Sequence, residues 1–159
     1  MWRVVATIAI STLLSACLCT KIGCTSGANF NLPDLPLDEA ARLVGGRIEI
    51  CHNDVCGTAA LPAAPAEAGT GIIVSVEDPI HSFVHVIVWR FDAAFRIEVD
   101  IAARNSVLVD GDVYTATLTA VDGSVVTSAA FHATSHRDQF PNGERCDDHP
   151  CRVAVLEPR

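Results

Sequence analysis

The sequence predicts an all-β fold, an antiparallel sandwich of about seven to nine strands that is stapled by disulfides and preceded by an N-terminal signal helix. Three observations lead to this prediction. Short apolar runs with a period of two recur at regular spacing, no long stretch has a helical period, and seven cysteines occur among 159 residues. A chain of this length suits one domain and can bury a core without help from a metal.

Composition narrows the function classes before any motif is considered. Half of the residues are hydrophobic and the mean hydropathy is +0.33, which excludes a disordered chain. No stretch reaches the roughly 20 apolar residues of a membrane-spanning helix. The formal net charge of −8 and the pI of about 5.0 argue against a nucleic-acid binder.

The first residues have the features of an export signal. Arg3 supplies a positive charge, residues 4–14 form an apolar run, and Leu14-Ser15-Ala16-Cys17 follows. This tetrapeptide resembles a bacterial lipobox. The resemblance implies that signal peptidase II cleaves before Cys17 and that the sulfur of Cys17 is acylated with a fatty acid such as palmitate. The alternative is an ordinary signal peptide that is cut after Ala16 and leaves Cys17 free.

The lipobox divides the chain into three expected segments. Residues 1–16 are the lipoprotein signal peptide, 17–24 the lipid-anchor tether, and 25–159 a single β-sandwich domain. Each buried acyl CH₂ contributes about 0.8 kcal/mol, so several acyl chains hold a protein on a bilayer. Leu18 follows the lipidated cysteine; in lipoproteins of enterobacterial type, the absence of Asp there implies the outer membrane.

The other six cysteines form three pairs with four residues inside each pair: Cys19 and Cys24, Cys51 and Cys56, Cys146 and Cys151. An oxidising compartment favours disulfides, and the equal spacing favours three local bridges. Cys51–Cys56 is the best supported, because Asn53-Asp54 suits a hairpin with a four-residue loop. The competing arrangement joins the first pair to the third and clamps the chain ends together.

A metal site is the second interpretation of these cysteines. Zinc sites more often use C-x₂-C or H-x₃-H spacing and need reduced thiolates, so we expect no metal and no cofactor. The soft ligands that a metal-binding module would use are Cys51, His52, Cys56, Cys146, His149 and Cys151.

Apolar residues alternate from residue 47 onward. The run at 95–101 is the clearest, with Phe95, Ile97, Val99 and Ile101 alternating with charged residues. In the run at 83–91, valines occupy one face and larger residues the other, which predicts a strand buried on both sides. Further strands are expected at 72–76, 112–121, 124–133 and 152–156, with an edge strand near 28–32, helical turns at 37–43 and a loop at 59–71.

Residues 110–123 carry a family resemblance. Asp110-Gly111 precedes Tyr114, and an alternating strand then ends at Asp122-Gly123, a two-residue type I′ turn signal. The pattern resembles the E–F corner of bacterial immunoglobulin-like and fibronectin type III domains. The resemblance implies an immunoglobulin-like sandwich in which the Tyr114 hydroxyl bonds to nearby backbone and Trp89 is the core tryptophan. The usual inter-sheet cysteine is missing at Ala116, and the fold itself implies no function.

The two ends of the chain carry a second resemblance. Gly23-Cys24 and the segment 140–151, with its Pro141-Asn142-Gly143 and two cysteines, resemble a group of small predicted lipoproteins from myxobacteria. Those proteins share a lipobox, an early Gly-Cys, a hairpin with two cysteines and a late pair of cysteines. The resemblance implies architecture and location but no activity.

Candidate catalytic groups are sparse. Ser135-His136-Arg137-Asp138, expected in a loop, is the cluster that an envelope hydrolase would use if His136 lay in a concave pocket against a carboxylate. Asp110, Asp112 and Asp122 bracket one strand and could bind calcium, but turn formation explains them better. Nucleotide-binding and zinc-protease motifs are absent.

These observations predict a lipid-anchored cell-envelope protein that acts as a binding or structural module without catalysis. Its expected partner is an envelope protein or a neutral or cationic polymer, because the net charge disfavours polyanions such as nucleic acid. The alternatives are an envelope hydrolase that uses residues 135–138 and the Cys/His metal-binding module.

Overall fold

The computed structural model describes residues 25–77, 83–104, 107–144, 147 and 149–159. A 3-10 turn, η1 (Leu37–Glu39), and one helical turn, α1 (Ala40–Leu43), lie at the expected place. Neither has the length and apolar character of a membrane span, and the predicted signal helix lies outside the described residues. The strands are β1 (Gly27–Asn31), β2 (Leu35–Pro36), β3 (Arg47–His52), β4 (Val55–Ala60), β5 (Gly71–Val76), β6 (Phe83–Arg90), β7 (Ala94–Ala102), β8 (Val113–Thr119), β9 (Val125–Gln139) and β10 (Cys151–Pro158).

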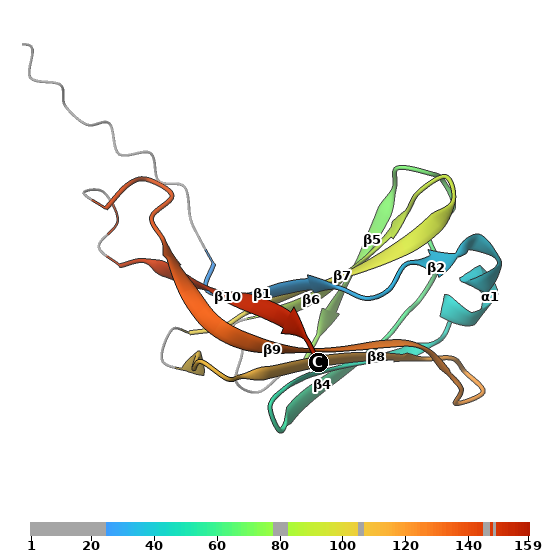
Figure 1. The fold of residues 1–159 in the computed structure, drawn as a ribbon. Coiled ribbons are helices and arrows are strands. Elements are labelled where there is room, and N and C mark those ends of the chain that lie inside the picture. The colour runs from blue at the N-terminus through green and yellow to red at the C-terminus, as the bar shows by residue number, and fades with distance from the viewer. Residues whose placement is uncertain (1–24, 78–82, 105–106, 145–146, 148) are drawn as a thin grey trace, which may run out of the picture.

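All ten strands belong to one mixed sheet that nearly closes on itself. The order is β4-β3-β8-β9-β10-β1-β7-β6-β5, with β2 beside β7. The sheet bends so that β1 and β7 face β8 and β4 across the core (Figure 1). One bridge between Thr58 and Glu77 links the two ends of this order. The all-β prediction is confirmed, but the purely antiparallel sandwich is wrong, because the sheet is continuous and β1 runs parallel to β10.

The position of β1 explains the mixed sheet. The sequence predicts an edge strand here, but Gly27 pairs with Val153 of β10 on one side and with Ala102 of β7 on the other. Gly27 has a φ of +148°, and a Cβ at this position would lie 1.7 Å from the carbonyl oxygen of Ile101. Only glycine tolerates this close approach between strands. The first and last described strands therefore pair inside the sheet rather than at its edge.

The 15-residue strand β9 carries the sheet from one wall to the other. Its first part pairs with β8, and its last part pairs with β10. The ladder with β10 is irregular between Val155 and Leu156, a bulge that increases the local bend. The predicted strand at 124–133 is thus confirmed but too short, because residues 134–139 continue it.

The predicted alternation in β7 is confirmed. Phe95, Ile97, Val99 and Ile101 are buried, and the valines of β6 are buried with them. The outer face of β6 is only half-buried, so the prediction of burial on both sides is wrong there. Trp89 lies on this outer face and is not the core tryptophan that the immunoglobulin resemblance implied.

Two turns differ in length from their predictions. The β3–β4 turn consists of Asn53 and Asp54 alone, since His52 still pairs with Val55. Asn53 has a φ of +52°, a conformation that asparagine tolerates better than most residues. The β8–β9 connection spans residues 120–124 rather than two residues, because the register shifts after Leu118.

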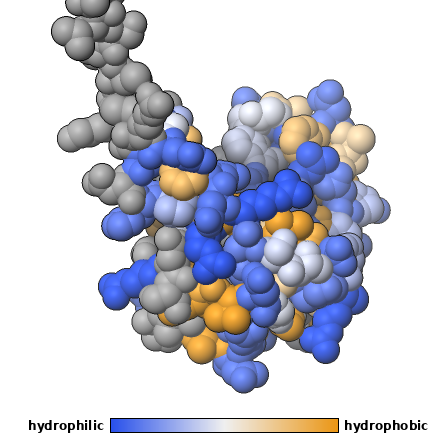
Figure 2. Space-filling model, turned by 60° about the vertical axis from the view of Figure 1, so that its left-hand side comes forward, coloured by the Kyte–Doolittle hydropathy of each residue, from blue (hydrophilic) through white to orange (hydrophobic). Residues whose placement is uncertain are grey.

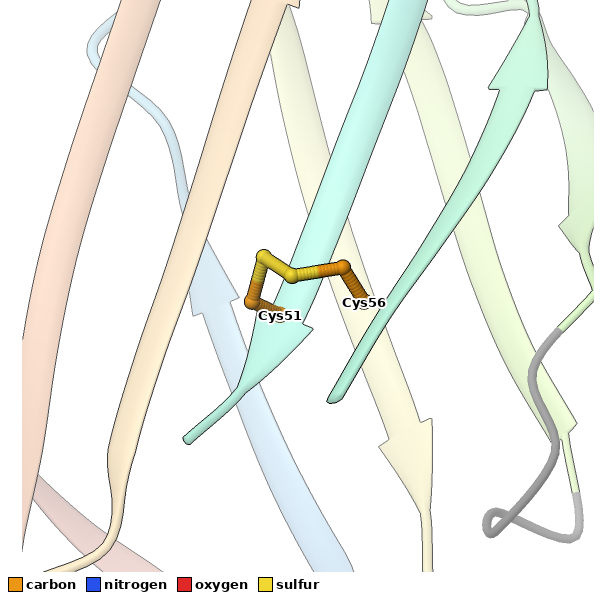
Figure 3. The surroundings of a disulfide bond; sticks show 2 residues. All are labelled: Cys51 and Cys56. Atoms are coloured by element: carbon orange, nitrogen blue, oxygen red, sulfur yellow. A yellow bond between two sulfur atoms is a disulfide. The ribbon is translucent and has the colours of Figure 1, made fainter. Parts of the chain in front are cut away.

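The predicted bridge between Cys51 and Cys56 is present (Figure 3). The two cysteines are directly opposite in the β3–β4 ladder, with their Cα atoms 4.0 Å apart. Cys151 is also disulfide-bonded, and its partner lies outside the described residues. Cys17, Cys19, Cys24 and Cys146 lie outside them as well. The choice between three local bridges and an end-to-end clamp therefore stays a prediction.

Removing the Cys51–Cys56 bridge should lower the stability moderately. The loop that it closes is short, so the chain-entropy estimate gives about 2 kcal/mol. We expect the double variant Cys51→Ser/Cys56→Ser to lose about this much free energy of unfolding in urea, with an unchanged far-UV circular dichroism spectrum. The matched control is Thr58→Ser, which lies in the same hairpin and leaves the bridge intact. A loss above about 4 kcal/mol would show that the cysteines do more than close a loop.

Candidate functional site

Residues 135–138 do not form the loop that a hydrolase would need. They lie in β9, where neighbouring side chains point to opposite faces. His136 does lie against a carboxylate, with Nδ1 2.9 Å from Oδ1 of Asp110. Its Nε2, however, is buried and makes no hydrogen bond within the described residues, while Ser135 is exposed on the other face. The strand therefore separates the serine from the histidine that would have to activate it.

The predicted Cys/His metal ligands are not assembled either. The sulfurs of Cys51, Cys56 and Cys151 are in disulfides and offer no thiolate. His52 points into the core, and Cys146 lies outside the described residues. Among the described residues, no three Cys, His, Asp or Glu side chains gather as a metal would need.

The three aspartates that bracket β8 serve three separate contacts. Asp110 contacts His136, and Asp122 accepts hydrogen bonds from the backbone N–H and the hydroxyl of Ser124. These bonds lower the pKa of Asp122 and stabilise the β8–β9 connection. Asp112 points inward. The turn-forming interpretation therefore describes Asp122, and the three carboxylates do not converge on a calcium site.

Asp112 is the centre of a buried polar network. Its Oδ2 lies 2.9 Å from Nε2 of His52 and accepts a hydrogen bond from the backbone N–H of Val109. Its Oδ1 accepts a hydrogen bond from the side chain of Asn53. Burial alone would raise the pKa of Asp112, but these partners outweigh it and hold the pKa below its usual value. The network ties the β3–β4 turn to the start of β8.

Tyr114 belongs to the same network and does not form a tyrosine corner. Its ring stacks on His52 with centroids 4.6 Å apart and an interplanar angle of 10°. The hydroxyl is buried and makes no hydrogen bond within the described part of the chain. Burial raises the pKa of Tyr114 accordingly. This correction removes the main structural support for the immunoglobulin resemblance.

The outer face of β6 differs from the rest of the surface. The other large exposed hydrophobic residues are four valines and Phe91, and one of them, Val121, lies beside Gly45, the neighbour of Val44. Figure 2 shows hydrophilic side chains around small separate hydrophobic patches on one side of the molecule. Small patches of this kind are normal. On the outer face of β6, by contrast, four half-buried side chains stand in one row at every second residue. Ile73 of β5, which is 67% exposed, lies opposite Ile87 in this row. We name the following set the β6 face: Phe83, His85, Ile87, Trp89 and Ile73.

Trp89 is held flat on the β6 face. It lies opposite Gly71 of β5, and a Cβ on this glycine would come within 2.7 Å of the indole ring. The absence of a side chain at residue 71 therefore leaves room for the ring to cover the strand. The indole Nε1 donates a hydrogen bond to Oε2 of Glu98, 3.2 Å away on β7, which fixes the ring's orientation.

Two carboxylates border the β6 face on β7. Glu98 accepts hydrogen bonds from Trp89 and from Asn29, whose Nδ2 lies 2.8 Å from Oε1. Asp100, two residues further on the same outer face, pairs in register with His85 and Asn29. Burial raises the pKa of Asp100, and the nearby His85 only partly offsets this effect.

A recessed surface lies on the outer side of β3 and β8, on the wall of the sheet that does not carry the β6 face. The hollow has a volume of about 480 Å³ and is wide open to solvent. Its only described cation, Arg47, already donates a hydrogen bond to Thr58. Its remaining lining residues are Gly45, Glu49, Thr117, Thr119, Ala120 and Val121. None of the described residues that line this surface is aromatic, and the surface offers positions for control variants.

Comparison of the chain with known protein families, with curated proteins and with solved structures finds no match. The candidate site therefore stands on its geometry alone. The sequence places Glu98 and Asp100 outward through the alternation of residues 95–101 but gives no reason to connect them with Trp89. Gly71 and Ile73 carry no recognisable motif, and only the β5–β6 register brings them to the β6 face.

Replacing Asp112 should destabilise the fold in a pH-dependent way. Asp112→Asn removes the charge that pairs with His52, and we expect a loss of about 3 kcal/mol in the free energy of unfolding at pH 7. Because folding lowers the pKa of Asp112, its contribution is complete above the unfolded value of about 3.9 and disappears as the pH falls through the folded value. Urea unfolding between pH 7 and pH 2 measures this difference.

The control is Asp54→Asn, the same chemical change at an exposed position of the same turn. It should cost less than about 0.5 kcal/mol at every pH. If the gap between wild type and Asp112→Asn were as large at pH 2 as at pH 7, the charge of Asp112 would not be what stabilises the turn.

Proposed function

We propose that the protein is a lipid-anchored binding module of the bacterial cell envelope, without catalysis, and that the β6 face is its recognition surface. The observation that carries this proposal is the contiguous row of half-buried aromatic and aliphatic side chains on β6, extended by the 67% exposed Ile73. Contiguous apolar surface on the outside of a folded domain is typical of an interaction site. Aromatic residues are enriched in such interfaces.

The sequence supports the proposed location of the module. The lipobox at 14–17 supports acylation of Cys17, and Leu18 supports sorting to the outer membrane. The oxidised state of Cys51, Cys56 and Cys151 agrees with an exported protein. The tether over 17–24 would then connect the anchor to the first described residues, at the start of β1.

A binding role is favoured over an enzymatic one by the arrangement of the reactive side chains. Nucleophilic catalysis needs a nucleophile within hydrogen-bond reach of a base. Ser135 and His136 lie on opposite faces of β9, and the free nitrogen of His136 has no access to solvent. The β6 face, in contrast, combines apolar contact area with hydrogen-bonding groups and needs no reaction to explain it.

The anchor is tested by the variant Cys17→Ser. We expect the wild-type chain to incorporate radiolabelled palmitate and to sediment with membranes, and the variant to lose both properties. Cys19→Ser, the same substitution two residues further on, should keep the label. An unlabelled wild-type protein in the soluble envelope fraction would support the ordinary signal peptide, cut after Ala16, and would overturn the lipid anchor.

The recognition surface is tested by photo-crosslinking in intact cells. We replace Ile73 with benzoylphenylalanine, since this side chain is exposed at the centre of the β6 face. Illumination should give a discrete crosslinked species of higher mass. The same residue at Thr117, on the outer face of the other wall, should not give that species. Crosslinking that is absent at 73, or equal at both positions, would contradict a binding role for the β6 face.

A further inference from the structure

We infer that the β6 face binds a basic segment of a partner protein, with lysine or arginine side chains lying over the indole ring of Trp89 and beside the carboxylates of Glu98 and Asp100. This inference rests on the proposed function and specifies the chemistry of the partner. It is drawn from the charges on the outer face of β7, from the orientation of the indole ring, and from the pairing of the nearby arginines.

The two carboxylates are close to each other and to the aromatic row. Glu98 and Asp100 are separated by one residue on the outer face of β7, a distance of about 7 Å along the strand. Ile87 lies opposite Glu98 and His85 lies opposite Asp100 on β6. Each carboxylate therefore has an apolar or aromatic neighbour on the next strand.

The protein itself offsets the negative charge on this face only in part, through His85 opposite Asp100 and through Arg96, two residues from Glu98. Arg96, the nearest described cation on β7, is bound by both oxygens of Asp34 at 3.1 and 3.2 Å, and it covers the ring of Phe91. Arg90 of β6 donates its hydrogen bond to the carbonyl oxygen of Ala66. Within the described residues, Asp100 receives no hydrogen bond, and Glu98 receives only the two neutral ones from Trp89 and Asn29.

The apolar part of the face suits the stem of a basic side chain. Lysine and arginine place their methylene groups along apolar surface and keep the charged head in a polar environment. Ile73 and Ile87 would contact the stem, and the carboxylates would receive the head. A cation near the face of a tryptophan gains further attraction, and one side of the Trp89 ring is turned away from β5.

Charge also decides between possible partners. All 19 acidic residues of the chain follow residue 24, whereas two of the 11 basic residues, Arg3 and Lys21, precede it. The β6 face is thus part of a strongly acidic domain, which repels nucleic acid and anionic lipid surfaces. A basic protein segment is attracted, and complementary charge would speed its association.

The experiment measures binding of a defined peptide to the full-length chain in detergent. The probe is a 12-residue peptide with lysine at every second position and valine between, and the reference probe is the same peptide with every lysine acetylated. Binding is followed by the fluorescence of Trp89. The other tryptophan, Trp2, lies in the proposed signal peptide and is replaced with Phe so that any uncleaved chain does not contribute to the signal. We expect the lysine peptide to shift this fluorescence, with a Kd that rises at higher salt, and the acetylated peptide to bind at least tenfold more weakly.

Charge variants locate the contact. Glu98→Gln/Asp100→Asn should weaken binding of the lysine peptide at least tenfold, and Asp100→Asn alone tests the same point if the double variant fails to fold. The control is Glu49→Gln/Asp54→Asn, which changes the net charge equally on the β3–β4 hairpin. This control variant should bind the lysine peptide with the same Kd as the wild-type chain. Equal weakening in both double variants would show general attraction to an acidic protein and would overturn the inference.

Other outcomes separate this inference from the proposed function. Equal binding of the acetylated peptide would overturn the cationic partner, while crosslinking at 73 would still support the β6 face as a recognition surface. Binding of a glucosamine oligomer in place of the peptide would overturn the protein partner in favour of a cationic polymer. If the chain with benzoylphenylalanine in place of Ile73 gave no crosslink, the proposed binding function of the β6 face would itself be overturned.

Discussion

The buried contact between His52 and Asp112 sets the arrangement of one whole wall of the sheet. Asp112 stands directly before β8 and holds the turn that ends β3 through His52 and Asn53. Asn53 returns the contact, because its side-chain oxygen accepts a hydrogen bond from the backbone N–H of Val113. With this turn fixed, His52 lies opposite Tyr114, and their rings stack. A one-residue slip would turn every inner side chain of β3 outward, so this polar network specifies the register that the apolar core then stabilises.

The nearly closed sheet moves any recognition surface to the outside. Side chains from both walls fill the interior, and Phe30 of β1 joins them by contacts with Tyr114 and Phe131, with ring centroids 6.5 and 4.9 Å apart. The inner residues of the sheet are therefore committed to packing. Within the described part of the chain, partners can meet the outer faces, the turns and the ends of the sheet. On the β6 face, apolar residues from two strands lie together next to the carboxylates of Glu98 and Asp100.

The sequence contains the local part of the fold but not its long-range part. Alternation at 95–101 and 83–91 predicts two strands and their inner faces, because the period of two depends only on neighbouring residues. The Cys51–Cys56 hairpin is predictable for the same reason. The parallel pairing of Gly27 with Val153 joins residues 126 positions apart, and no local pattern reports it. The polar end of β9, from residue 134 onward, reads as a loop because its strand structure comes from pairing with β10.

Like the fold, the candidate site has features that the sequence predicts and features that depend on long-range pairing. Its charges also support the proposed partner. The immunoglobulin resemblance places Trp89 in the core, but the glycine opposite it makes space for the ring on the outer surface. Burial raises the pKa of Asp100, so keeping its charge at neutral pH costs free energy in the folded state. A strand that served stability alone would gain from a neutral residue or a nearby arginine at this position. A half-buried carboxylate whose charge His85 offsets only in part, beside an oriented indole, fits the basic partner segment that we propose.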